Sequence, residues 1–360
     1  MRHLIRASFI ISTLVVLLLL AAVALNAQSA PSKPLPSGTQ ILFLGTAGGP
    51  PLRLDRSEPA TLLIVDGRMY LIDCGIGTMR RLLEAGIPSE QIKTIFFTHL
   101  HADHDLGLAD VMANDYFSLN LLGSSETMDI YGPPQTAALV DAAFHYLAFG
   151  FTAFAAEPSA LGQALKARGP SSPFIAHEIA KDGLVYSDDK VRVTAAENSH
   201  YTFMEANDRK RMKSYSYRIE TPHGVVVFTG DTGPSDAVAR LAKGADVLVS
   251  EVLDLDETAA TVKAMAQRGH WPRQRATALM AHMRQEHLDQ QEVGNIASTA
   301  HVKAVLLYHY DPEDPAAEVA RLKKFFRGPV FASADLDRYC LNQLSGGPAL
   351  SPCPTSAPKP

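Results

Sequence analysis

The sequence predicts an α+β fold in which two β-sheets pack face to face and helices cover their outer faces, a four-layer αββα sandwich. In the first part of the chain the predicted strands follow one another in hairpins, and in the second part they alternate with helices. The 360 residues are 46% apolar and 20% charged, which is an ordinary globular composition with enough apolar material for a large core.

The apolar runs predict the strands and helices in order. Asp66-Gly67 lies between two such runs, 61–65 and 69–73, and predicts a hairpin turn; Pro222-His223-Gly224 predicts a second one. Helical spacing predicts a helix over 78–85 that stops at Gly86. The other predicted strands cover 41–45, 93–98, 128–131, 191–196, 214–220, 225–229, 246–250 and 304–308. The other predicted helices cover 104–120, 135–149, 289–300 and 315–326.

The first thirty residues have the layout of a secretory signal peptide. Arg2 and Arg6 precede an apolar run over 9–25, and small residues within 22–27 offer cleavage sites. The run also approaches the length that spans a bilayer, so an uncleaved membrane anchor is the alternative. We therefore expect residues 1–30 to direct the protein out of the cytoplasm, to the periplasm of a Gram-negative cell or to the medium.

The rest of the chain divides into a linker, one large domain and a tail. Residues 31–40 are rich in Pro and Ser and are typical of a linker, and 41–340 contain the predicted strands and helices. Within this domain, about 112–186 lack clean alternation of strands and helices, so we expect a mainly helical insertion there. Residues 341–360 are rich in Gly, Pro and Ser, which predicts a disordered tail.

The strongest functional signal is a cluster of potential metal ligands directly after the predicted strand over 93–98. His99 and His101 are two apart in an extended segment, so their side chains point to the same side. Asp103 and His104 follow where the chain turns into the next helix. Imidazole nitrogen combined with carboxylate oxygen suits zinc, and also manganese or iron. The alternative is a histidine-rich surface loop.

Three further residues, His200, Asp231 and His309, occupy equivalent positions just after apolar strands. Loops at strand ends gather into sites, so each is a candidate ligand. Taken singly, each also has an ordinary explanation: Asp231 suits a turn or a helix N-cap, and His309 suits a hydrogen-bonded core histidine.

This series, His-x-His-x-Asp-His, a lone His, Gly-Asp-Thr and a strand-end His, resembles the metallo-β-lactamase superfamily. The segments Leu44-Gly45-Thr46-Ala47-Gly48-Gly49-Pro50 and Leu71-Ile72-Asp73-Cys74-Gly75 look like the first two landmarks of that family. The resemblance runs from about residue 41 to about residue 335. The pattern is most similar to the ribonuclease Z-like branch, which also includes arylsulfatase-like hydrolases. It implies the fold of that superfamily and a metal-dependent hydrolase.

The resemblance also assigns the ligands and implies two Zn²⁺ ions, with Mn²⁺ or Fe as alternatives. Asp231 would bridge both ions, and Asp73 would stiffen the histidine loop from behind. Two such ions would share a bridging hydroxide as the nucleophile. One ion would be held by His99, His101 and His200, and the other by Asp103, His104 and His309.

Two residues are candidate acid–base catalysts. Asp103 would orient the hydroxide or take its proton. His287 would protonate the leaving oxygen, because the ribonuclease Z-like branch places a catalytic histidine in such a segment, before the last ligand. His282 is the competing candidate, and a solvated loop histidine is the ordinary reading of either. Glu286 or Glu251 would orient His287.

The predicted substrate is a small-molecule phosphodiester or sulfate ester rather than RNA. The interval between His200 and Asp231 is too short for the long tRNA-gripping arm of true ribonuclease Z, and its basic cluster over 209–213 suits a solvated turn. The net charge of −5 and the export signal also argue against a nucleic-acid partner. A membrane partner is expected only if residues 1–30 remain uncleaved, and a homo-oligomer stays open.

Other functions remain open at this stage. A lactonase or carboxylic esterase would use the same ligands, and so would a cyclic-nucleotide phosphodiesterase. A non-enzymatic binding protein on the same scaffold is disfavoured, because none of the expected ligand positions is lost.

Two further groups of side chains have open roles. Aromatic residues in the insertion would line an apolar pocket mouth, form helix core or face a membrane: Phe144, Tyr146, Phe149, Phe151 and Phe154. Cys340 and Cys353 would pair in an oxidising compartment, which would leave Cys74 as a buried free thiol.

Overall fold

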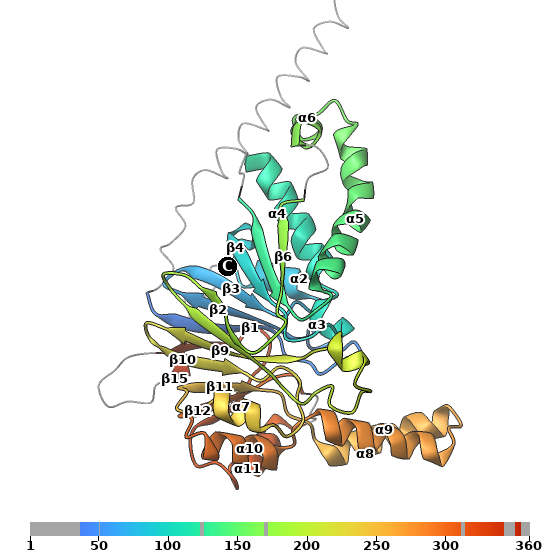
Figure 1. Ribbon diagram of the computed structural model, residues 1–360, viewed down its shortest axis with the longest axis vertical. Coiled ribbons are helices and arrows are strands. Elements are labelled where there is room, and N and C mark those ends of the chain that lie inside the picture. The colour runs from blue at the N-terminus through green and yellow to red at the C-terminus, as the bar shows by residue number, and fades with distance from the viewer. Residues whose placement is uncertain are drawn as a thin grey trace, which may run out of the picture. The chain divides into compact units, whose positions relative to one another are not determined.

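The computed structural model describes residues 37–49, 51–122, 126–168, 172–310, 314–341 and 350–353. Their strands form two mixed sheets with helices outside them (Figure 1), so the predicted αββα fold class is confirmed. The predicted signal peptide, residues 1–30, lies outside the described residues. The first strand begins at Thr39, inside the segment predicted as a linker.

The first sheet has the strand order β15-β14-β1-β2-β3-β4-β5-β6. Its β2–β3 turn has Asp66 and Gly67 at φ 46° and 88°, the left-handed pair that a tight hairpin requires. From β3 to β6 the strands run parallel. The strands are β1 (Thr39–Gly45), β2 (Ala60–Val65), β3 (Arg68–Ile72), β4 (Ile92–Phe96), β5 (Met128–Gly132), β6 (Phe174–Glu178), β14 (Arg338–Leu341) and β15 (Leu350–Pro352).

The second sheet has the order β13-β12-β11-β10-β9-β8-β7. Strands β10 to β13 are parallel, and β8 runs antiparallel to β9, which runs antiparallel to β10. The carboxyl ends of β8, β10, β11 and β12 therefore lie at one edge of this sheet. The strands are β7 (Gly183–Ser187), β8 (Arg192–Glu197), β9 (Tyr215–Thr221), β10 (Gly224–Phe228), β11 (Val247–Ser250), β12 (Ala304–Leu307) and β13 (Val330–Ala332).

The helix predicted over 104–120 is two helices in the structure, α3 (Ala102–Asp105) and α4 (Leu108–Leu122). The break falls at Gly107, whose N–H donates to the carbonyl of Cys74 over 2.8 Å. A Cβ at this glycine would lie 2.3 Å from the carbonyl oxygen of Gly75, so the backbones touch here. This contact holds the start of the ligand-bearing segment against the loop after β3.

The helices are α2 (Thr78–Glu84), α3 (Ala102–Asp105), α4 (Leu108–Leu122), α5 (Thr136–Ala155), α6 (Ala160–Arg168), α7 (Asp236–Leu241), α8 (Leu255–Arg268), α9 (Arg273–Glu286), α10 (Gln290–Thr299) and α11 (Pro315–Leu322). Short 3₁₀ turns cover Ser89–Gln91 and Asp208–Lys210. Asp289 caps α10 with a reciprocal capping box, which explains why this helix begins where the sequence predicts.

The core lies between the two sheets, where the inward sides of their strands interdigitate. Fully buried aromatic side chains from both sheets meet there, with Phe96 and Tyr217 at a ring distance of 5.7 Å. A second cluster fills the space between the second sheet and α7, α10 and α11. The central strands are buried on both sides, so their apolar runs are continuous rather than alternating.

The segment over 112–186 contains helices α5 and α6, and also β6 and β7, which the apolar pattern did not predict. Phe144 and Phe151 on α5 pack against Tyr116, whereas Tyr146 and Phe149 are 72% and 82% exposed. Of the described helices, α5 is the one whose length and apolar composition would suffice to cross a bilayer, and core helices can pass the same test.

The prediction of a disordered tail over 341–360 is wrong for residues 350–353, which are ordered. Strand β15 pairs with β14, and Cys340 and Cys353 form a disulfide, which together hold this segment on the first sheet. The other residues beyond 341 lie outside the described part of the chain. Cys74 is a buried free thiol, as expected.

Candidate metal centre

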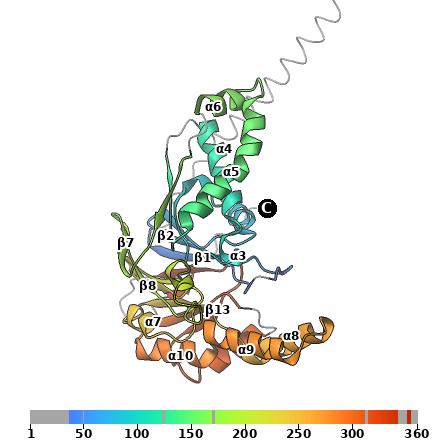
Figure 2. The same ribbon diagram turned by 45° about the vertical axis from the view of Figure 1, so that its right-hand side comes forward.

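All seven predicted ligands meet where the carboxyl ends of strands from both sheets come together. His99 and His101 follow β4, and Asp103 and His104 lie on α3. Figure 2 shows this short helix beside the sheets. His200, Asp231 and His309 follow β8, β10 and β12 of the other sheet.

One ligand set consists of His99, His101, His200 and Asp231, whose potential ligand atoms all lie within 4.8 Å of one another. The three imidazoles face each other, with His200 Nε2 3.3 Å from His101 Nδ1. The Nδ1 atom of His200 donates to the main-chain oxygen of Glu286 over 3.0 Å, which leaves Nε2 to face the centre of the set. This is a nitrogen-rich arrangement of the kind zinc prefers.

The second set consists of Asp103, His104, His309 and again Asp231, all buried. His309 Nε2 lies 3.3 Å from a carboxylate oxygen of each aspartate. His104 Nε2 lies 3.4 Å from Asp231 Oδ1. The carboxylate of Asp231 therefore faces both ligand sets.

The donor atoms fit divalent metal ions. Among the described residues, His99 Nε2, His104 Nε2 and Asp231 Oδ1 are buried and have no hydrogen-bond partner. Leaving such atoms unsatisfied costs about 1–3 kcal/mol each, so three of them together indicate that this space receives a cation.

Burial and charge set the protonation of these groups. Burial lowers the pKa of His99 and His200 well below 6.5, so both imidazoles are neutral, the form that binds metal. Burial alone would raise the pKa of Asp231, but the neighbouring His309 and His104 hold it well below its usual range. Asp231 is therefore an anionic donor.

Asp73 supports the ligand loop from behind, as the sequence predicts. Its carboxylate accepts from the main-chain N–H of Thr98 at 2.7 Å and from the Thr98 hydroxyl. It also lies 2.9 Å from His104 Nδ1, which directs His104 Nε2 toward Asp231. Asp73 itself has φ 57°, an uncommon backbone conformation that these contacts hold in place.

Gly49 leaves room for the second ligand set. A Cβ on Gly49 would lie 2.2 Å from the Cβ of Asp103, closer than any side chain tolerates. Gly49 therefore allows this loop to pass directly against a ligand.

His287 lies beside the ligands and is held by Glu251. Its Nδ1 is 2.6 Å from Glu251 Oε2, and one of its ring nitrogens lies within 4.8 Å of the ligand atoms of Asp231 and His309. Burial lowers the pKa of His287, but the Glu251 carboxylate outweighs it and raises the pKa to about 9. The imidazole is therefore protonated at neutral pH.

His282 is in a different position. It contacts the carboxylate of Glu286 and the ring of Phe203, its side chain is 41% exposed, and it belongs to none of the ligand groups. Of the two carboxylates considered for orienting His287, the structure pairs it with Glu251.

The comparisons with known proteins agree with this geometry. The family described as "Beta-lactamase superfamily domain" matches residues 68–310. The chain belongs to the metallo-β-lactamase superfamily. It is therefore a metal-dependent hydrolase, and the resemblance found in the sequence is confirmed.

Relatives named ribonuclease Z are similar to this superfamily member over most of its length. The protein of Mycobacterium marinum is 29% identical over 276 residues, which cover 76% of this chain and 86% of the relative. The protein of Methanothermobacter thermautotrophicus is 28% identical over 320 residues, covering 78% and 89%.

Solved structures share the fold of this superfamily member at lower identity. The metallo-β-lactamase fold protein YhfI from Bacillus subtilis has a TM-score of 0.59 and 17% identity, with 84% of this chain and 99% of that chain covered. The short form of human tRNase Z has a TM-score of 0.55 and 20% identity, with 83% and 98% covered.

Sequence analysis of this superfamily member missed one side chain at the site. Tyr201 is buried, and its ring lies 5.3 Å from that of His101 and 4.8 Å from that of His200. Its position directly after a candidate ligand was the available signal. Its ring therefore packs against two of the candidate ligands.

Proposed function

We propose that this protein is an exported hydrolase that uses two divalent metal ions, with zinc favoured, to cleave phosphodiesters or sulfate esters. The observation that carries the proposal is the pair of ligand sets that share Asp231. When bound, two such ions would lower the pKa of a shared water and neutralise charge that develops on phosphoryl or sulfuryl oxygens.

The residues of the chain would hold the two ions and position the attacking water. His99, His101 and His200 would hold one ion, and the carboxylate of Asp231 would serve both. The second set would add Asp103, His104 and His309. The free carboxylate oxygen of Asp103 would orient the attacking water or take its proton.

His287 would donate the proton that the leaving oxygen needs. Glu251 accepts from Nδ1–H, which orients the ring and leaves Nε2–H as the proton donor. The Glu251 pairing also keeps the imidazole charged at neutral pH. His287 lies close to the ligands but belongs to neither of the two ligand sets that share Asp231, so it is free to protonate the leaving oxygen.

The relatives named ribonuclease Z bring a nucleic-acid phosphodiester back among the candidate substrates, although the acidic net charge and the proposed export argue against it. They support the phosphodiester part of the proposal more than the sulfate-ester part. A small-molecule phosphodiester and an RNA strand present the same reacting group, so both belong in the substrate panel.

The test combines metal content with activity. Asp231→Ala should lower bound zinc, measured by elemental analysis after reconstitution and dialysis, by more than one equivalent, because one carboxylate serves both ions. Asp141→Ala removes an aspartate whose side chain is 71% exposed and serves as the matched control.

The substrate panel consists of bis-aryl phosphate, aryl sulfate, a short RNA, a lactone and a β-lactam. Turnover confined to the lactone would contradict the proposal and indicate a carbon-centred hydrolase. Zinc content that stays at zero in the reconstituted wild type would contradict the metal assignment itself.

Export, with removal of the N-terminal segment, belongs to the same proposal. The mature chain should lie outside the cytoplasm and lack roughly 24–30 N-terminal residues, as read by mass spectrometry of fractionated cells. Full-length protein attached to the membrane would instead indicate an anchor. Full-length protein in the soluble cytoplasm would contradict export.

A further inference from the structure

Helices α8 and α9 form a hairpin that extends from the second sheet beside the candidate metal centre. The chain enters it after Glu251 and leaves it at His287, so both ends of the hairpin belong to the site. Figure 1 shows the two helices side by side, directed away from the sheets. At the turn, His270 has φ 50° and the N–H of Trp271 donates to the carbonyl of Ala266, which sets Trp271 across the end of the pair.

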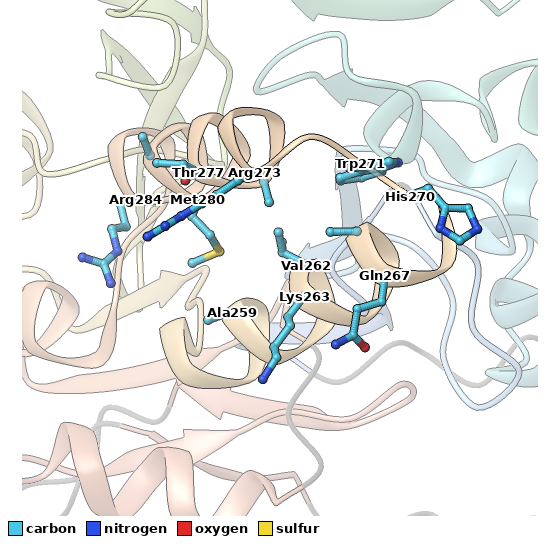
Figure 3. Close-up of a pocket in the computed structure, with 13 residues that line it drawn as sticks. Ala259, Val262, Lys263, Gln267, His270, Trp271, Arg273, Thr277, Met280 and Arg284 are labelled. Atoms are coloured by element: carbon cyan, nitrogen blue, oxygen red, sulfur yellow. The ribbon is translucent and has the colours of Figure 1, made fainter.

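The two helices line a shallow hollow of about 780 Å³ that is open to solvent. Val262 and Met280 lie between the helices, Trp271 lies at the turn, and Arg284 lies at the opposite end (Figure 3). Alanines from both helices complete a largely apolar lining. This volume lies in the range of small-molecule sites, which are typically 300–1,000 Å³.

The part of the hairpin over 258–285 is basic although the whole chain is acidic, with a net charge of −5; Asp256, Glu257 and Glu286 lie at the ends of the hairpin that join the second sheet. Between 258 and 285 there are no acidic residues, and the cations are Lys263, Arg268, Arg273, Arg275 and Arg284. All five are exposed, and none forms an ion pair with a residue in the described part of the chain.

Three of these cations, Lys263, Arg273 and Arg284, line the hollow, and Arg275 lies over the Trp271 ring at 4.2 Å. An apolar hollow with unpaired cations around it matches a ligand that has an apolar body and an anionic head. We propose that this hollow binds a small amphiphilic anion, with its apolar body between the helices and its carboxylate, sulfate or phosphate head on these cations.

Two macromolecular alternatives fit less well. Among the described large apolar side chains of the hairpin, Met265 is the strongly exposed one, at 37%, so the hairpin offers little surface that would insert into a bilayer. A nucleic-acid backbone would use the cations and has no need of a concave apolar lining. Binding at the hollow does not depend on the proposed function, because it requires no turnover.

The chain offers a specific reporter, since Trp271 is its only tryptophan. Titrating metal-replete protein with dodecanoate should shift the Trp271 emission in a saturable way, with half-saturation below about 1 mM. Inorganic phosphate alone, and dodecyltrimethylammonium, which carries the same chain with the opposite charge, should each bind at least tenfold more weakly.

Matched variants distinguish dodecanoate binding in the hollow from nonspecific attraction of the anion to positive charge. Lys263→Gln/Arg273→Gln/Arg284→Gln should weaken dodecanoate binding at least tenfold, because the head loses its cations. Met280→Gln, which keeps the length of the side chain and makes the lining polar, should weaken it about fivefold. The control removes three exposed cations at the end of α11: Lys323→Gln/Lys324→Gln/Arg327→Gln should leave binding unchanged.

Equal losses in the two triple variants would overturn the proposal, since bulk charge would then explain the effect. It would also be overturned if dodecanoate gave no saturable shift. Saturable binding of a 20-nucleotide RNA or of phosphatidylglycerol vesicles, with no response to dodecanoate, would assign the hairpin to a macromolecular partner instead.

Discussion

Asp188 directly follows β7 and links the two sheets through its carboxylate, so its replacement should destabilise the fold. Its Oδ2 accepts from the hydroxyls of Tyr70 on β3 and Tyr186 on β7, at 2.7 and 2.8 Å. Arg68 donates to the same oxygen at 2.9 Å, and two main-chain N–H groups of the following turn donate to Oδ1. One carboxylate therefore satisfies donors from both sheets.

The magnitude follows from what Asp188→Ala would leave behind. Tyr70 is fully buried, so its hydroxyl would lose a charged acceptor, at a cost of about 1–3 kcal/mol. The half-buried Tyr186 and the main-chain groups reach water more easily and add about 1–2 kcal/mol together. The Arg68 side chain is 46% exposed, so that pair adds less than about 1 kcal/mol. We expect a loss of about 3 kcal/mol in the free energy of unfolding.

The loss should depend on pH. Burial opposes ionisation of Asp188, but the bonds from Tyr70, the main-chain amides and Arg68 hold its pKa below the usual range. A lowered pKa in the folded state stabilises the fold fully above the unfolded value near 4. This contribution declines as the pH falls below that value and is lost only below the folded pKa. The difference between wild type and Asp188→Ala should therefore shrink between pH 7 and pH 3.

Urea unfolding followed by circular dichroism measures both effects, with an unchanged m value as the check that the unfolded states are comparable. Asp189→Ala is the matched control: its side chain is 65% exposed, and it also pairs with Arg68. This control should change the free energy of unfolding by less than about 0.5 kcal/mol. A loss under 1 kcal/mol for Asp188→Ala, or an equal loss at both pH values, would refute the reasoning.

Three further predictions concern the site. His287→Ala should keep its zinc and lower turnover by roughly 10²–10⁴, with a smaller loss on nitrophenyl esters, whose leaving groups need little protonation; loss of zinc would make His287 a ligand. Glu251→Gln should lower the pKa of His287 from about 9, so the alkaline limb of the kcat/KM profile should move to lower pH; an unmoved limb would exclude His287 as the acid. Gly49→Ala should reduce zinc content and activity, because its Cβ would overlap Asp103, and unchanged zinc content would show that the loop yields.

Much of the fold could be predicted because its local signals agree with the tertiary structure. The Asp66-Gly67 turn and the apolar runs on either side specify a hairpin without help from the rest of the chain. Strands β6 and β7 could not be predicted, because their side chains are mostly half-buried or exposed and show little apolar pattern. The break between α3 and α4 depends on a contact with the loop after β3, which no local pattern contains.

The sequence by itself determined the types of donor at the site and their order along the chain, because the candidate ligands lie in the segments that follow strands. Only the tertiary structure decided that Asp231 faces both ligand sets and that Glu251 rather than Glu286 holds His287. It also decided that the Tyr201 ring packs against the first ligand set. These relations join loops from two sheets that are far apart along the chain. Their distances are set by strand register and by the packing of one sheet on the other, and neither is written in any single stretch of residues.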